Sequence, residues 1–93
     1  MRIWVLFEVT MEQKIKSDTE INIGKNIHDL RKAKQIRQKD MVREMQLRGL
    51  PITREAYVKI EGGRQHIYAS QLEAIKDVLG VSYDELLARK EMG

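Results

Sequence analysis

Apolar residues recur along most of the chain three or four positions apart, which is the spacing of a single buried stripe on an α-helix. Ile23, Ile27 and Leu30 show the pattern, and Met41, Val42 and Met45 form the next apolar set. The pattern predicts an all-α bundle of five short helices. They are expected at residues 23–35, 38–45, 53–62 and 70–79, and in a short last helix that follows Ser82 and carries Leu86 and Leu87.

Residues with capping preferences set the expected ends of these helices. Asn22 and Thr53 are predicted N-caps, because their side chains accept hydrogen bonds from the free N–H groups of a first helical turn. Gly62-Gly63 and Gly80 suit the left-handed turns that end a helix. Capping-box spacing is found in two pairs, Ser70 with Glu73 and Ser82 with Glu85.

The N-terminal residues differ in character from the rest. Ile3–Phe7 is an apolar run that predicts a short strand, which would pair with a partner chain or pack on the bundle. The run is too short for a membrane-spanning or secretory segment. Translation starting at Met11 is an alternative, since Glu8–Thr10 can be encoded by a purine-rich ribosome-binding sequence. We expect a strand-like or disordered extension with a polar linker over 1–21, one domain over 22–88, and a frayed tail over 89–93.

Composition argues against a catalytic or metal centre. The chain has no cysteine, and its two histidines, His28 and His66, lie far apart in the sequence. We find no clustered nucleophile and base and no glycine-rich phosphate loop between a strand and a helix. We therefore expect no enzyme activity, no cofactor, no metal, no small-molecule ligand and no membrane association. The absence of cysteine also suits a reducing cytoplasm.

Positive charge is concentrated in the middle of the chain. Residues 25–64 hold eleven Lys and Arg against five Asp and Glu, a net charge of +6, whereas 1–24 and 65–93 carry −1 and −2. Such a concentration is typical of proteins that bind the phosphate backbone of nucleic acids. Ordinary solvated Lys and Arg on helix surfaces would give the same count, so charge alone leaves both interpretations open.

Four short segments, in this order and at this spacing, resemble the Cro/C1-type (Xre-like) helix-turn-helix domain over about two thirds of the chain. The resemblance implies a compact five-helix lambda-repressor-like bundle whose third helix, 53–62, enters the major groove while the second crosses the backbone. It also implies a buried ion pair between Arg31 and Glu61. The segments are Leu30-Arg31, Gln38, Tyr57–Gly63, and Leu79–Ser82 with Leu86-Leu87.

A helical wheel of residues 53–62 places Tyr57 and Ile60 on one side and Glu55, Val58 and Lys59 on the other. The resemblance separately implicates Arg54, Glu55 and Lys59. Arginine or lysine donates to guanine, glutamate accepts from cytosine, and valine touches a thymine methyl. Contacts to phosphates alone, or a favourable glutamate at the helix dipole, are the alternatives. The expected DNA-binding residues are Arg37, Gln38, Lys39, Thr53, Arg54, Glu55, Val58, Lys59 and Arg64.

Two further interpretations stay open for these residues. Gln38 resembles the family's glutamine that bonds a phosphate or clamps a base-reading side chain, or it is simply a polar residue at a helix start. The expected turn Gln46–Ile52 has seven residues, whereas the usual turn has three or four. The longer turn would push a loop outward, with Arg48 near a phosphate, or change the crossing angle and shift the contacts by one position.

The resemblance implies a sequence-specific regulator of transcription, a repressor that binds double-stranded DNA as a homodimer. It would act in the cytoplasm of a bacterium, or be phage-derived, and lie on the nucleoid when bound. The alternative is a protein-interaction module, such as an antitoxin or adaptor that keeps the fold. That alternative predicts binding through the apolar N-terminal segment and little salt-sensitive affinity for DNA.

Overall fold

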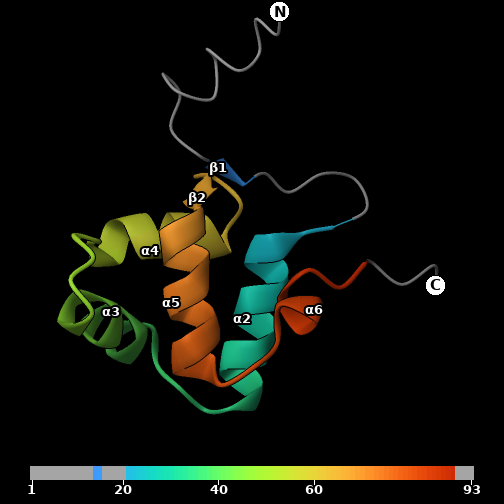
Figure 1. Cartoon of the computed structure of the whole chain (residues 1–93), viewed down its shortest axis with the longest axis horizontal. Helices are drawn as coiled ribbons and strands as arrows, with labels where there is room; N and C mark the ends of the chain where they lie inside the picture. Colours follow the sequence, from blue (N-terminus) through green and yellow to red (C-terminus); the bar gives the residue numbers. More distant parts are fainter. Residues whose placement is uncertain (1–13, 16–20, 90–93) are drawn as a thin grey trace, which may run out of the picture.

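Five helices and one pair of short strands make up the part of the chain that the computed structural model describes, residues 14–15 and 21–89 (Figure 1). The predicted all-α five-helix bundle is confirmed. The predicted strand at Ile3–Phe7 and the alternative start at Met11 lie outside the described residues. The elements are β1 (Lys14–Ile15), α2 (Ile23–Ala33), α3 (Gln38–Leu47), α4 (Arg54–Glu61), β2 (Ile67–Tyr68), α5 (Ala69–Leu79) and α6 (Tyr83–Leu86).

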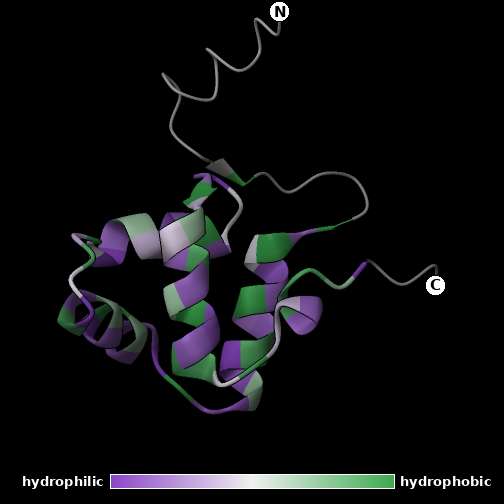
Figure 2. Ribbon diagram, viewed as in Figure 1, coloured by the Kyte–Doolittle hydropathy of each residue, from purple (hydrophilic) through white to green (hydrophobic). Residues whose placement is uncertain are grey.

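The apolar stripes of the helices meet in one core. Helix α2 packs against α4, α5 and α6, and α3 packs against α4 and α5. Figure 2 shows hydrophobic and hydrophilic residues side by side along each helix, as expected of amphipathic helices around a shared core. Leu86 is fully buried, whereas Leu87, which directly follows α6, is exposed. The largest fully buried side chains are Ile27, Met41, Met45, Tyr57, Ile75 and Leu86.

Each of the four longer helices ends near a residue with positive φ. These residues are Gln35 (59°), Gly49 (90°), Gly63 (74°) and Gly80 (67°). After α2, α3 and α4, the residue with positive φ and the residue that follows it both donate backbone hydrogen bonds to carbonyl oxygens of the last helical turn. This pattern is the Schellman motif. The predicted turns after Glu61 and Leu79 are confirmed. Helix α2 ends at Ala33, two residues earlier than expected. The left-handed residue after it is Gln35. Glutamine, unlike glycine, is not typical of this position, so the sequence does not indicate that the helix ends here.

Three of the predicted N-caps are confirmed. The side-chain oxygens of Asn22, Thr53 and Ser82 each accept from the backbone N–H three residues further on, at 3.0–3.1 Å. Glu85 completes the box at Ser82 by accepting from its backbone N–H at 3.1 Å. These short-range signals are local, so the sequence alone is enough to identify them.

The predicted capping box at Ser70 is wrong. Helix α5 begins at Ala69, so Ser70 lies inside its first turn. The N–H of Tyr68 donates instead to the side-chain oxygen of Gln71 at 2.9 Å. The cap is displaced because β2 ends at Tyr68 and leads into the helix without an intervening loop.

The N-terminal segment 1–21, expected to include a polar linker, contains a strand at Lys14–Ile15. Lys14 and Ile15 pair antiparallel with Tyr68 and Ile67, respectively. Ile67 is buried and Ile15 packs partly against the core. Strand β1 therefore pairs with the strand that leads directly into α5.

Candidate DNA-binding surface

Helix α4 is only eight residues long, and its two faces differ sharply in exposure. Tyr57, Ile60 and Glu61 are buried against the rest of the bundle, whereas Arg54 and Glu55 are exposed. Val58 and Lys59 are half-buried. The burial of Tyr57 and Ile60 agrees with the predicted wheel. Thr53 is exposed and caps the helix, so its hydroxyl is already engaged with the backbone N–H of Ala56.

The approach of α2 to α4 is closer than a side chain would allow. A Cβ placed on Gly24 would lie 2.4 Å from the backbone oxygen of Ile60 and 2.8 Å from that of Glu61. Both neighbours are main-chain atoms, which cannot swing aside as a side chain can. Only glycine fits here, and this role was missed from the sequence, where Gly24 interrupts a helical pattern without an evident reason.

A buried ion pair ties α2 to α4, as the resemblance implies. Arg31 Nε donates to Glu61 Oε2 at 2.7 Å, and Arg31 Nη2 donates to Glu61 Oε1 at 3.1 Å. The two side chains are 8% and 3% exposed. Arg31 Nη1 also donates to the carbonyl oxygen of Ile36 at 2.8 Å, in the link between α2 and α3. The pair therefore holds three parts of the chain in one arrangement.

The surroundings keep both partners of this pair charged. Burial raises the pKa of Glu61, but the hydrogen bonds donated to it outweigh burial and leave that pKa below its ordinary value. The hydrogen bond to Glu61 raises the pKa of Arg31. Burial also raises the pKa of Tyr57, whose hydroxyl is fully buried. Tyr57 therefore belongs to the core, and its hydroxyl does not reach the rim of the surface.

Gln38 joins this buried pair from a third helix. It is the first residue of α3, and its Nε2 donates to Glu61 Oε1 at 3.2 Å. This bond places the start of α3 beside the end of α4, whereas Arg54 lies at the opposite end of α4. The expected DNA-contacting residues therefore do not lie at one place: Gln38 lies beside the end of α4, and Arg54 lies at its start.

The cations of the predicted set differ in whether they are already paired. Lys59 Nζ lies 3.7 Å from Glu55 Oε1, one helical turn away. Arg37 Nε lies 3.0 Å from Asp40 Oδ2, and this hydrogen bond is the largest influence lowering the pKa of Asp40. Among the residues that the structure describes, no acidic partner lies within ion-pair distance of Lys39, Arg54 and Arg64.

The turn between α3 and α4 is long, but it is tied down. Helix α3 continues to Leu47, so the connection has six residues, Arg48–Thr53, instead of the seven expected. Gln46 Nε2 donates to the carbonyl oxygen of Ile52 at 2.8 Å, and the Ile52 side chain is buried. The guanidinium of Arg48, expected near a phosphate, lies 3.5 Å from a carboxylate oxygen of Glu44 in the preceding turn.

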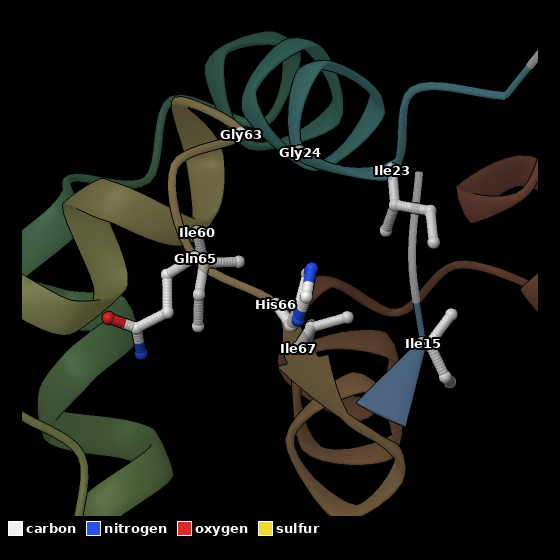
Figure 3. Close-up of a pocket in the computed structure, with 8 residues that line it drawn as sticks. All are labelled: Ile15, Ile23, Gly24, Ile60, Gly63, Gln65, His66 and Ile67. Atoms are coloured by element: carbon white, nitrogen blue, oxygen red, sulfur yellow. The ribbon is translucent and has the colours of Figure 1, made fainter. Parts of the chain in front are cut away.

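Two hollows lie near this surface. The first, of about 120 Å³, lies between the strands, α2 and the end of α4, and Figure 3 shows isoleucines around it. The second, of about 290 Å³, lies at the corner between α2 and α3 and is basic. The first is lined by Ile15, Ile23, Gly24, Ile60, Gly63, Gln65, His66 and Ile67, and the second by Arg31, Lys32, Gln35, Ile36 and Arg37.

Comparison with protein families, with curated proteins and with solved structures finds no match to this chain. Within the described residues, no three His, Cys, Asp or Glu side chains gather in a way that could hold a metal ion. In the same residues, no helix combines the length and the apolar character needed to cross a membrane. Function is therefore inferred from the geometry of α3 and α4.

Proposed function

We propose that this protein is a sequence-specific double-stranded DNA-binding regulator of transcription, acting as a repressor, with α4 as the helix that enters the major groove. The observation that carries the proposal is the two-sided character of α4. Its inner face is held by Tyr57, Ile60 and Glu61, and its outer face presents Arg54, Glu55 and the half-buried Val58 and Lys59. An eight-residue helix is about 12 Å long, which suits a major groove about 12 Å wide.

Three features support binding to phosphates beside the groove. Lys39 and Arg64 are exposed cations without an acidic partner among the described residues. Helix α3 begins without a side-chain cap, which leaves backbone N–H groups of its first turn available to an anion. Residues 25–64 also hold eleven Lys and Arg against five Asp and Glu. Such contacts raise affinity without reading sequence.

Base recognition is proposed for the outer face of α4. Arg54 is exposed and has no acidic partner in the described part of the chain, so it can donate to guanine without first leaving an ion pair. The ammonium group of Lys59 lies near Glu55, so on binding it would interact with both this carboxylate and DNA. The carboxylate of Glu55 fits best opposite a cytosine amino group, from which it can accept a hydrogen bond. A phosphate or the acceptor atoms of a guanine would repel it.

A homodimer on a pseudo-palindromic site is part of the same proposal, since two-fold dimers are the usual way for this motif to read two half-sites. Apolar surface suitable for self-association is present on α6 and directly after it. Tyr83 and Leu87 are exposed there, at 40% and 37%. Cytoplasmic action on chromosomal or phage DNA completes the proposal.

The proposal is tested by selecting duplexes from a random-sequence pool with the purified protein. Fluorescence anisotropy then compares the selected duplex with a scrambled one at two salt concentrations. We expect strong preference for the selected duplex, weakening with salt, and a loss on Lys59→Ala. No enrichment, together with equal weak binding to both duplexes, would refute the proposal and favour the protein-interaction alternative.

A further inference from the structure

Gln38 has a hydrogen-bond partner inside the protein, which changes what its side chain can do at the surface. Its Nε2 donates to Glu61 Oε1 at 3.2 Å, and the residue is half-buried. A glutamine whose only task was to bind a phosphate would need no such partner, because water satisfies an exposed amide. The bond therefore indicates a second task, directed inward.

The chemistry of Glu61 fixes how the amide of Gln38 is oriented. An ionised carboxylate only accepts hydrogen bonds, so the NH₂ group of Gln38 must face it and the amide oxygen must point elsewhere. Glu61 Oε1 also receives Arg31 Nη2 at 3.1 Å, and Arg31 Nε occupies Oε2 at 2.7 Å. Gln38 thus binds a carboxylate that is already held rigidly.

The resulting network joins α4 to the two helices against which it packs, α2 and α3. Arg31 belongs to α2, Gln38 begins α3, and Glu61 ends α4. At the same end of α4, Gly24 of α2 lets the backbone of α4 approach so closely that a Cβ would lie 2.4 Å from the Ile60 carbonyl oxygen. Helix α4 is therefore fixed against α2 by backbone contact and the ion pair, and against the start of α3 through Gln38.

Resting on the proposed function, we propose that Gln38 is a positioning residue, which sets the placement of α4 in the groove through Glu61, and that it is not a phosphate ligand. A hydrogen bond at one end of an eight-residue helix controls the angle at which the other end, with Arg54, reaches the bases. A phosphate ligand supports all DNA sequences alike. A positioning residue supports only the sequence that the correctly placed helix recognises.

The test uses Gln38→Met, which keeps the length of the side chain and removes its hydrogen bonds. We expect affinity for the selected duplex to fall about tenfold, the order of one base contact, while affinity for the scrambled duplex and the salt dependence stay as in the wild type. Lys39→Ala is the matched control at the next position. It should weaken binding to both duplexes equally and reduce the logarithmic salt slope by about one.

The outcomes separate this inference from the proposed function. If the wild type does not prefer the selected duplex, both fail together. If the wild type discriminates but Gln38→Met weakens both duplexes equally, Gln38 is a phosphate ligand and only the inference fails. Thermal unfolding followed by circular dichroism establishes that each variant is folded under the conditions of the binding assay.

A measurement on the unaltered protein keeps the inference testable if Gln38→Met does not fold. The side-chain amide of Gln38 is followed by nuclear magnetic resonance while the selected duplex is added. A positioning residue keeps its bond to Glu61, so both amide protons retain the shift difference of the free protein. A change in this shift difference on adding either the selected or the scrambled duplex would show that the amide leaves Glu61 for a phosphate and would overturn the inference.

Discussion

Removing one partner of the buried Arg31–Glu61 pair should cost the protein a large part of its stability. In Arg31→Met, the Glu61 carboxylate loses donors at 2.7 and 3.1 Å, in a position where its side chain is only 3% exposed. Breaking a buried pair in this way costs about 3–5 kcal/mol. A domain of about 70 residues has only about 4–10 kcal/mol of total stability, so one substitution consumes a large part of it.

The double variant Arg31→Met/Glu61→Leu distinguishes two free energies. One is the destabilisation caused by leaving the Glu61 carboxylate without its partner, and the other is the net contribution of the intact pair to stability. Apolar side chains of similar volume often replace a buried pair at no cost, so we expect the double variant to recover most of the lost stability. Gln38 then loses its acceptor, but it is half-buried and can turn to water. Urea unfolding monitored by circular dichroism gives the free energies of unfolding for the wild type and both variants.

Two results would refute this account of the pair. One is a loss of less than about 1 kcal/mol in Arg31→Met, the range of an exposed ion pair. The other is a double variant as unstable as the single one, which would mean that packing of the arginine stem matters more than the unpaired carboxylate.

Three further outcomes follow from the same structure. Gly24→Ala should destabilise the fold by about 1–3 kcal/mol through overpacking. Gly62→Ala should stay close to wild type in urea unfolding, because its new Cβ would lie at ordinary contact distance, 3.4 Å from the Arg64 side chain and 3.5 Å from the Val58 carbonyl oxygen. Gln35→Gly should raise the unfolding free energy by about 0.5–1 kcal/mol, because glycine adopts its φ of 59° without strain; unchanged or lower stability would contradict this. Since the pKa of Glu61 lies below its ordinary 4.5, its contribution to stability is complete above about pH 4.5 and is lost as the pH falls through the lowered value. Unfolding titrations over that pH range should show a smaller acid loss in the double variant.

Much of the helical framework is predictable from the sequence because its signals are local. Asn22, Thr53 and Ser82 lie three residues before the N–H groups that they cap, and Gly80 ends α5 with its own backbone. Helical stripes likewise identify the buried Tyr57 and Ile60 of α4, since burial repeats with the helical period. Such features depend on residues within one turn of each other.

Features that depend on distant partners could not be predicted in this way. The strand at Ile15 exists because Ile67 lies beside it, although 51 residues separate the two in the sequence. Gly24 looks like an interruption in α2 until the backbone of α4 is found against it. The resemblance predicts a contact of Gln38 with DNA from its position in the motif, and only the structure reveals its bond to Glu61.

In the proposed function, stability and DNA binding depend on opposite faces of α4, and this separation makes the proposal testable by substitution. The inner face is fixed by core packing and the buried pair, so changes there alter both properties. On the outer face, Arg54 has no acidic partner among the described residues and Lys59 has an exposed pair at 3.7 Å, an arrangement worth about 0–1 kcal/mol. Replacing either cation should therefore leave unfolding nearly unchanged, so that any loss of DNA binding reports directly on the contact surface.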